Sequence, residues 1–198
     1  MTKSQISNFH LYYLGNEELL KEKKMIAVVG SREMSDYGRK MIEKFVPELV
    51  KMGYVIVSGM AFGVDAWAHK ITLDNKGKTI AVLASGVDMP TPKSNKFIYE
   101  RILKEKGLIV SQFINGTIPK PINFLQRNEV VVDLVSKVLV IEGDNHSGAL
   151  VTAKMAIDKG REVYCIPGRI GDMNSFTPNF LIKNGANLVM EIDDIIGT

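Results

Sequence analysis

Short apolar runs recur along the chain, and most of them end in glycine or in a polar turn. The runs are continuous rather than alternating in polarity, which is typical of parallel β-strands that helices cover on both faces. We expect strands at 25–30, 54–59, 79–86, 108–113, 137–143 and 162–167, and a shorter one at 187–190.

Segments with helical periodicity separate these runs. In residues 35–52 the apolar side chains share one helical face, with Ser35 as a suitable N-cap and Gly53 as a suitable stop. Pro47 lies inside this segment and is expected to kink the helix or to break its hydrogen bonding. Further helices are expected at 64–75, 94–106, 123–135, 147–159 and 176–184.

The alternation of strands and helices predicts an α/β fold, a doubly wound and mostly parallel sheet with helices on both faces. The chain has 198 residues, of which 45% are hydrophobic and 24% charged, which is enough apolar material for one large domain. Residues 1–24 are expected to form an N-terminal arm and residues 25–198 the core domain.

The net charge and the cysteine content bear on the class of partner and on the cellular compartment. The formal net charge of +3 permits a nucleic-acid partner without requiring one. The single cysteine, Cys165, excludes an internal disulfide, and its apolar surroundings predict a buried structural thiol. No apolar run reaches membrane-spanning length, and the N-terminus lacks the pattern of a secretion signal. We therefore expect a cytoplasmic protein that does not associate with membranes.

The loops after the expected strands are rich in glycine, serine and threonine. In an open α/β sheet, ligands bind beyond the carboxyl ends of the strands. Four of the five principal loops there combine glycine with serine or threonine just before a helix, where free amides and the helix dipole favour anions. The sequence therefore predicts a phosphate-binding edge, formed by 30–35, 58–63, 84–90, 114–120 and 142–149.

The first of these loops differs from the common nucleotide-binding patterns. It is not a Gly-x-Gly-x-x-Gly turn, and the chain has no Gly-x-x-x-x-Gly-Lys-Ser/Thr loop, so neither NAD binding nor ATP hydrolysis is supported and no cofactor is expected. Arg32 lies at its tip, where a guanidinium could hold a phosphate with two hydrogen bonds. A surface arginine paired with Glu33 or Asp36 is an equally good interpretation.

Two further groups of side chains could carry function. Phe124 and Arg127 share a helical face, an arrangement suited to base stacking beside a cation, although composition alone favours a core phenylalanine and a solvated arginine. Asp65 and His69 also share a face and could form an acid–base pair or bind a metal. We favour Asp65 as a residue that orients the glycine loop and His69 as a packing residue, and we expect no metal site because no further ligands complete a set.

The chain carries five motifs in this order: VVGSR (28–32), SGMAFGVDAWAH (58–69), NFLQRN (123–128), SGALVTAKMAIDKGREVYCIPG (147–168) and LIKNGANLV (181–189). Together they resemble the DprA (Smf) family of DNA-processing proteins. The resemblance spans roughly residues 12–197 and implies an extended Rossmann-like fold that binds single-stranded DNA without catalysis. It also implies a homodimer that brings RecA recombinase to that DNA during natural transformation. The helical N-terminal domain and C-terminal winged helix of many family members are not expected within these 198 residues.

The resemblance implies a set of DNA-binding residues. The glycines of 58–63 would let a DNA backbone approach, with Asp65 and His69 stabilising the loop. Lys93 and Lys120, in loops at the same edge, are further candidate cations. The complete expected set is Ser31, Arg32, Ser58, Gly59, Ala61, Gly63, Lys93, Lys120, Phe124, Arg127, Asn128, Ser147 and Gly148.

Two departures from the family pattern bear on affinity. Leu125 stands where the family usually has proline, and Glu129 where it usually has a second arginine. An acidic side chain near the groove is expected to weaken phosphate binding.

An enzyme of the phosphoribohydrolase (lysine-decarboxylase-like) group is the strongest alternative. That group is expected to carry a Pro-Gly-Gly-x-Gly-Thr-x-x-Glu segment, which residues 143–153 do not match. The candidate acids and bases are Asp65, His69, Asp88, Glu142 and Asp144, of which Glu142 is the best placed. A non-catalytic sensor of a nucleotide signal is a third possibility, and the motifs favour DNA binding over both.

Overall fold

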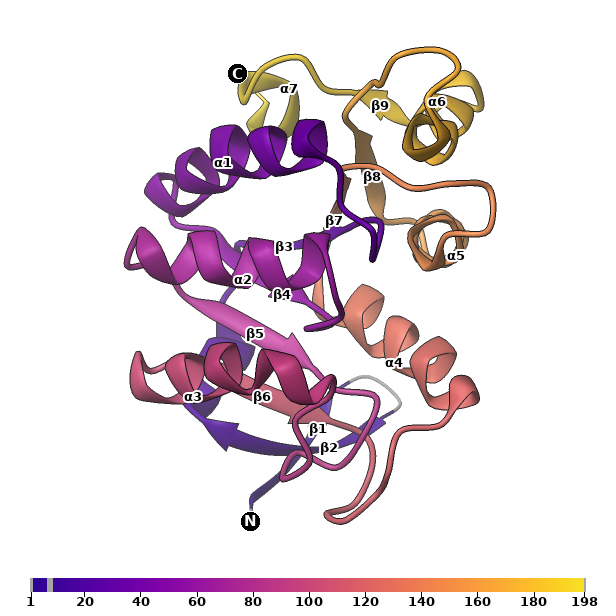
Figure 1. The fold of residues 1–198 in the computed structure, drawn as a ribbon. Helices are drawn as coiled ribbons and strands as arrows, with labels where there is room; N and C mark the ends of the chain where they lie inside the picture. The colour runs from indigo at the N-terminus through magenta and orange to yellow at the C-terminus, as the bar shows by residue number, and fades with distance from the viewer. Residues whose placement is uncertain (1, 7–8, 198) are drawn as a thin grey trace.

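The computed structural model describes residues 2–6 and 9–197 and shows one mixed sheet between two layers of helices (Figure 1). The nine strands of this described part lie in the order β1-β2-β6-β5-β4-β3-β7-β8-β9. From β6 to β9 neighbouring strands are parallel. Their bounds are Thr2–Ile6 (β1), Phe9–Gly15 (β2), Met25–Val29 (β3), Val55–Ser58 (β4), Thr79–Val82 (β5), Leu108–Ser111 (β6), Lys137–Val140 (β7), Glu162–Cys165 (β8) and Asn187–Leu188 (β9).

Helices cover both faces, as the alternating pattern predicted. Side chains of α1, α2 and α7 pack on one face of the sheet, joined there by those of α3. Side chains of α4, α5 and α6 pack on the other. Their bounds are Asp36–Lys51 (α1), Val64–Asp74 (α2), Lys96–Lys104 (α3), Pro121–Leu134 (α4), Gly148–Asp158 (α5), Phe176–Lys183 (α6) and Asp193–Ile196 (α7). The predicted fold class and each predicted strand and helix are confirmed, with ends shifted by a few residues.

The N-terminal arm is part of the sheet, which sequence periodicity did not predict. β2 pairs antiparallel with β6, and β1 pairs antiparallel with β2. Leu11 and Tyr13 of β2, and Leu19 of the following 3-10 turn Glu17–Lys21, are buried in the same core as the parallel strands. The arm therefore completes one edge of the core sheet.

Helix α1 runs through Pro47 as one element, so the proline does not end the helix. Ser35 caps it as predicted, because its hydroxyl accepts a hydrogen bond from the amide of Gly38 at 3.0 Å. Burial of Phe45 and Leu49 on either side of the proline holds the helix together despite the missing N–H donor.

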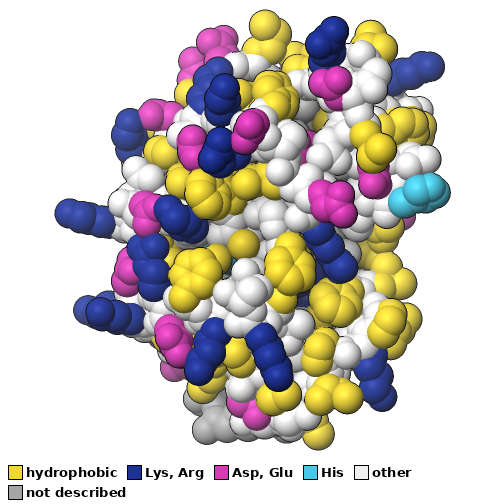
Figure 2. All heavy atoms as spheres, in the orientation of Figure 1, with side chains coloured by type: hydrophobic (Ala, Val, Ile, Leu, Met, Phe, Trp, Pro, Cys, Tyr) yellow, Lys and Arg dark blue, Asp and Glu magenta, His cyan; other side chains and the backbone are white. Residues whose placement is uncertain are grey.

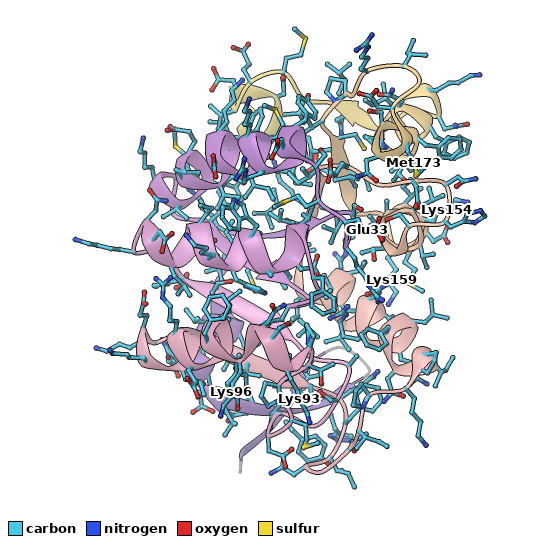
Figure 3. All side chains as sticks on the ribbon, in the orientation of Figure 1. Glu33, Lys93, Lys96, Lys154, Lys159 and Met173 are labelled. Atoms are coloured by element: carbon cyan, nitrogen blue, oxygen red, sulfur yellow. The ribbon has the colours of Figure 1, made fainter. Side chains whose placement is uncertain are left out.

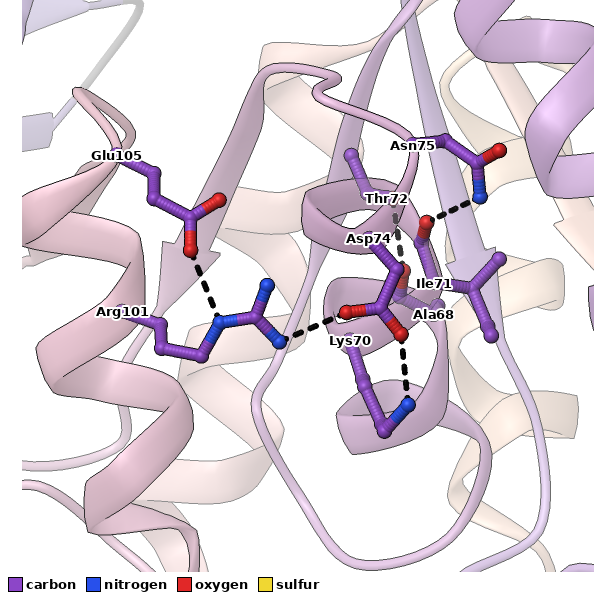
Figure 4. Close-up of polar contacts among 8 residues, drawn as sticks. All are labelled: Ala68, Lys70, Ile71, Thr72, Asp74, Asn75, Arg101 and Glu105. Atoms are coloured by element: carbon purple, nitrogen blue, oxygen red, sulfur yellow. Dashed lines mark hydrogen bonds and ion pairs between the residues drawn. The ribbon is translucent and has the colours of Figure 1, made fainter.

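An ion-pair network fixes α2 beside α3 (Figure 4). The carboxylate of Asp74 accepts from Lys70 at 2.6 Å and from Arg101 of α3 at 2.9 Å, and Arg101 also binds Glu105 at 2.9 Å. These contacts hold the pKa of Asp74 below its ordinary value, chiefly through the hydrogen bond from Lys70. The two helices therefore present the loops that precede them side by side.

The direction of strand addition reverses between β3 and β7. Strands β3 to β6 follow one another toward one edge, whereas β7 to β9 proceed toward the other. At such a switch point the loops after two neighbouring strands diverge and leave a crevice.

Candidate functional site

A pocket of about 460 Å³ opens at this switch point. Its walls come from the loops after β3, β4 and β7, from the segment after β8, from α4 and from the first turns of α5. Ten of the sequence-predicted residues line it: Ser31, Arg32, Gly59, Ala61, Asp65, Phe124, Arg127, Asn128, Ser147 and Gly148. Asp144, one of the candidate acids, also lines it, whereas the other predicted residues lie outside its lining.

Arg32 is exposed at the mouth of this pocket. Its guanidinium carbon lies 5.0 Å from the centre of the Phe124 ring, within the range of a cation–π contact. Among the described residues it forms no ion pair with Glu33 or Asp36, and Asp36 instead pairs with Arg39 at 2.9 Å. The interpretation of Arg32 as a paired surface residue is therefore wrong, and its charge is free to meet an anion.

Phe124 is half-buried and lines the pocket rather than filling the core. It lies near two cations, since the guanidinium carbon of Arg127 is also 5.9 Å from the ring centre. The composition-based expectation of a core phenylalanine is wrong, because α4 begins at the sheet edge and turns this position toward the crevice.

Arg127 is buried, with 5% of its surface exposed, and its guanidinium binds the protein itself. Nη1 donates to the carbonyl oxygen of Gly59 and, at 2.9 Å, to that of Val82, and Nε donates to Asn128 at 3.1 Å. Burial lowers the pKa of Arg127, and the nearby Asp65 carboxyl opposes that shift. Both earlier interpretations need correction, because Arg127 is neither solvated nor a free phosphate ligand: it ties α4 to the ends of β4 and β5.

The glycines of the loop after β4 leave room for neighbouring atoms of the protein itself. A Cβ on Gly59 would lie 2.1 Å from Nη1 of Arg127, and one on Gly63 would lie 2.3 Å from the carbonyl oxygen of Ser31. Gly63 also has a φ of 69°, which favours glycine. The packing of the chain itself therefore requires glycine at both positions, and the approach of a DNA backbone to this loop stays a prediction.

Ser58 does not face the pocket. It is fully buried, and its hydroxyl donates to the carbonyl oxygen of Val28 at 2.7 Å. The strand side of the loop is thus closed to ligand. Ser31 is buried too, but it lines the pocket, and its hydroxyl accepts from the amide of Glu33 at 3.1 Å.

Asp65 and His69 have separate partners. Asp65 accepts from the amide of Ala61 at 3.3 Å and so orients the glycine loop, as predicted, while burial raises its pKa. His69 is fully buried, and its Nδ1 lies 2.7 Å from the hydroxyl of Thr79 in β5. Burial, reinforced by Arg127, lowers the pKa of His69 to about 3, so the ring is neutral and joins α2 to the sheet.

The start of α5 forms another wall of the pocket. The hydroxyl of Ser147 caps the helix by accepting from the amide of Ala149 at 3.1 Å. Gly148 is exposed, and a Cβ there would meet open space. The amides of Ala149 and Leu150 are thus already bonded to Ser147, and the exposed Gly148 is the position at which this helix start is open to an anion in the crevice.

Lys93 and Lys120 are exposed at the same edge of the sheet but outside the pocket lining. Lys93 lies in the 3-10 turn Lys93–Asn95 before α3, and Lys120 directly precedes α4. In Figure 3, Lys93 lies below Glu33, on the side of the molecule toward α3. A ligand would have to extend beyond the pocket to reach these lysines.

Sequence reasoning missed the strap after β8. Asn174 lines the pocket, its side-chain amide donates to the carbonyl oxygen of Glu33 at 2.9 Å, and its carbonyl accepts from the amide of Gly143 at 2.6 Å. Residues 166–175 follow the carboxyl end of β8, at the same edge of the sheet as the other loops. Their place directly after a predicted strand is the signal that could have identified them as part of the site.

Glu129, which was expected to weaken phosphate binding, and Glu142, the best-placed candidate acid, both have partners within the protein. Glu129 pairs with Lys159 at 3.1 Å, and it does not line the pocket. Glu142 is buried and accepts from the amide of Ser35 at 2.7 Å and from its hydroxyl at 2.5 Å, so it supports the cap of α1. Neither carboxylate faces the crevice.

The remaining predictions concern the thiol, metals and membranes. Cys165 is a free, buried thiol, as predicted, and burial raises its pKa to about 12. Across the described residues, no group of three or more His, Cys, Asp and Glu side chains could hold a metal ion. No helix among these described residues has the length and apolarity needed to cross a bilayer.

The doubly wound, mostly parallel sheet, with an arginine and an aromatic ring at its switch-point crevice, defines a protein of the Rossmann-like class. The sequence matches the family described as DNA recombination-mediator protein A over residues 2–198, and the chain belongs to that family.

Individual relatives agree with this assignment. The chain is 41% identical to protein Smf of Escherichia coli, across 86% of this chain and 46% of the relative. It is 41% identical to DNA processing protein DprA of Streptococcus pneumoniae, across 94% of this chain and 65% of the relative. The chain thus spans about half to two thirds of these relatives.

Solved structures of two relatives share the fold. The X-ray structure of DprA from Streptococcus pneumoniae superposes with a TM-score of 0.89 at 40% identity, covering 94% of this chain and 65% of that one. A structure of DNA processing protein A from Helicobacter pylori gives 0.86 at 29% identity, covering 94% and 85%, and was described for its single-stranded DNA binding mode.

Proposed function

We propose that this chain binds single-stranded DNA in the switch-point pocket and helps to load RecA recombinase onto it during DNA processing in natural transformation. The observation that carries the proposal is the exposed Arg32 beside Phe124 at the mouth of the pocket. A cation for phosphate next to an aromatic face for a base is the combination that single-strand binders use. The likeness to the Helicobacter pylori protein supports the same substrate.

The pocket residues divide into contacts and supports. Arg32 and the start of α5 would hold phosphates, and Phe124 with Asn128 would meet a base. Arg127 and Asp65 would act indirectly, by fixing the loop after β4. Lys93 and Lys120 would bind phosphates of nucleotides outside the pocket.

The proposal includes no catalytic step. Glu142, the acid best placed for hydrolysis in the sequence, is engaged by Ser35, and His69 is buried against Thr79. Neither can exchange a proton with a ligand in the crevice without rearrangement of the fold. We further propose that the protein acts as a homodimer in the cytoplasm, where RecA and incoming DNA meet.

The test compares a single-stranded oligonucleotide with duplex of equal length in a filter-binding titration at two salt concentrations. We expect preferential binding of the single strand, weakened by salt because phosphate contacts release counterions. Equal affinity for duplex, or binding that salt does not change, would contradict the proposal. Light scattering over a concentration series tests the dimer, and a monomer at tens of micromolar would exclude it for this chain.

A further inference from the structure

Phe62 is an exposed aromatic at the tip of the loop between β4 and α2, with 51% of its surface accessible. Its neighbour Ala61 lines the switch-point pocket, so Phe62 lies at the rim. We propose that Phe62, with Lys93 and Lys96, forms a second subsite for single-stranded DNA. A strand held in the pocket would continue across the beginnings of α2 and α3. This inference rests on the proposed function and adds the path of the strand.

The loop that carries Phe62 is fastened to the segment that carries the lysines. The side-chain amide of Asn95, which is 6% exposed, donates to the carbonyl oxygens of Met60 at 3.0 Å and Ala61 at 3.2 Å. Lys93 and Lys96 flank Asn95 in the sequence. Phe62 is therefore held at the same end of the molecule as both ammonium groups.

The two helices behind these side chains are also fixed relative to each other. The ion pairs of Asp74 with Lys70 and Arg101 join the far end of α2 to α3 (Figure 4). With contacts at both ends, the loop before α2 and the turn before α3 form a stable platform. A strand would meet a surface that is already arranged, which lowers the entropic cost of binding.

The charges on this platform are available. Among the described residues Lys93 forms no ion pair, and Lys96 is 3.6 Å from Glu100 in a pair whose side chains are both more than 60% exposed, which is weak. Figure 3 shows Lys93 and Lys96 next to each other at the start of α3, and Figure 2 shows lysine or arginine side chains projecting from that part of the face. One unpaired lysine and one weakly paired lysine beside an exposed ring suit successive nucleotides.

A second route out of the pocket passes Met173. That residue also lines a neighbouring pocket of about 540 Å³, which contains Phe176 and Phe180. These two rings are stacked on each other, with centroids 5.7 Å apart and planes at 10°, so each covers a face of the other. Among the described residues Phe62 stacks on no other aromatic ring, and this difference favours the route over α2 and α3.

The experiment compares two oligothymidylates, one of about four nucleotides that fills the pocket and one of about twelve that extends beyond it. We expect Phe62→Ala to weaken binding of the longer strand about tenfold and to leave binding of the shorter strand unchanged. Phe62→Trp, which keeps an aromatic ring at this position, should bind the longer strand as the wild-type protein does. Lys96→Ala should reduce the salt slope of the longer strand by about 1. Phe176→Ala and Lys183→Ala are matched controls on the other route and should change neither strand.

A stacking readout separates contact from fold. We expect a 2-aminopurine placed outside the pocket-bound nucleotides to be quenched on binding to the wild-type protein and less so with Phe62→Ala, whose circular dichroism should be unchanged. Unaltered affinity for the longer strand in Phe62→Ala and Lys96→Ala would overturn the subsite, as would a loss caused by Phe176→Ala instead. Failure of the wild-type protein to bind either strand would refute the proposed function and this inference together.

Discussion

The Nη1 of Arg127 donates to the carbonyl oxygen of Gly59, so a side chain of α4 closes the loop that ends β4. The site therefore contains two arginines with different roles. Arg127 is buried and supports the loop from within, whereas Arg32 is exposed and faces the crevice.

Replacing each arginine by alanine should separate these roles. Arg127→Ala should lower the free energy of unfolding by about 3 kcal/mol, because it leaves buried carbonyl oxygens and the Asp65 carboxyl without their partner. Arg32→Ala should change stability by less than about 0.5 kcal/mol and reduce DNA binding. Urea unfolding and filter binding on the same preparations measure both. A stable Arg127→Ala protein, or an Arg32→Ala protein with full affinity, would reverse the assignment.

Phe124→Ala tests the base contact. Loss of one stacked base is worth about 1–3 kcal/mol, so single-strand affinity should fall about tenfold or more while the protein stays folded. Leu125→Ala is the matched control, since Leu125 lies on the same helix turn and lines the same pocket but has no aromatic face. Fluorescence anisotropy gives the affinities. If Phe124→Ala unfolds the protein and affinity per folded molecule is kept, Phe124 is a packing residue.

His69 should make stability depend on pH. Its folded pKa of about 3 lies below the ordinary value of 6.5, so between these values the unfolded chain binds a proton that the native state does not. Stability should therefore fall as the pH drops from 6.5 toward 3, by at most about 1.4 kcal/mol per pH unit. The raised pKa of Asp65 acts in the opposite sense in the acidic part of this range.

The measurement is the difference between wild-type and His69→Gln unfolding curves over that range. Subtraction removes the contributions of Asp65 and of other carboxyls, since both proteins share them. The difference should narrow as the pH falls, because the wild-type protein alone loses the histidine contribution. A constant difference across the range would show that His69 is not held neutral in the folded state.

The chain should release no free base from nucleoside monophosphates. Hydrolysis needs an acid or base at the ribose, and Glu142 is turned toward Ser35 instead. Incubation with AMP followed by chromatography for adenine is the direct measurement. Steady turnover that Glu142→Gln abolishes and that added oligonucleotide does not change would assign the protein to the hydrolases. Because Glu142 also supports the cap of α1, circular dichroism must show that this variant is folded.

Most of the fold could be predicted because local signals and tertiary environment agree. The continuous apolar runs are strands buried on both faces, and Ser35 caps a helix that its own neighbourhood specifies. β2 was not predicted, because its placement depends on pairing with β6, nearly a hundred residues away in the chain. No local pattern in 1–24 indicates that partner.

The site was predictable in position and less so in detail. The loops at the strand ends identified the edge of the sheet where the site lies. Arg32 and Arg127 differ in their exposure to solvent, and the sequence alone does not show which arginine is buried. The environment of Gly59 was likewise hidden, since the atoms that require a glycine there belong to α4. The residue types indicated which interactions are possible at the site. The packing determined which side chains are accessible to a ligand and which are already bonded within the protein.

The hairpin of β1 and β2 has a practical consequence for anyone who shortens this protein. A chain trimmed at residue 24 would keep every parallel strand but would leave the outer side of β6 with unpaired N–H and C=O groups. It would also uncover the apolar side chains that Leu11 and Leu19 now cover. Open strand edges of this kind recruit other chains. The hairpin thus keeps β6 and the core beside it away from the open edge of the sheet, a position that the short strand β1 takes instead.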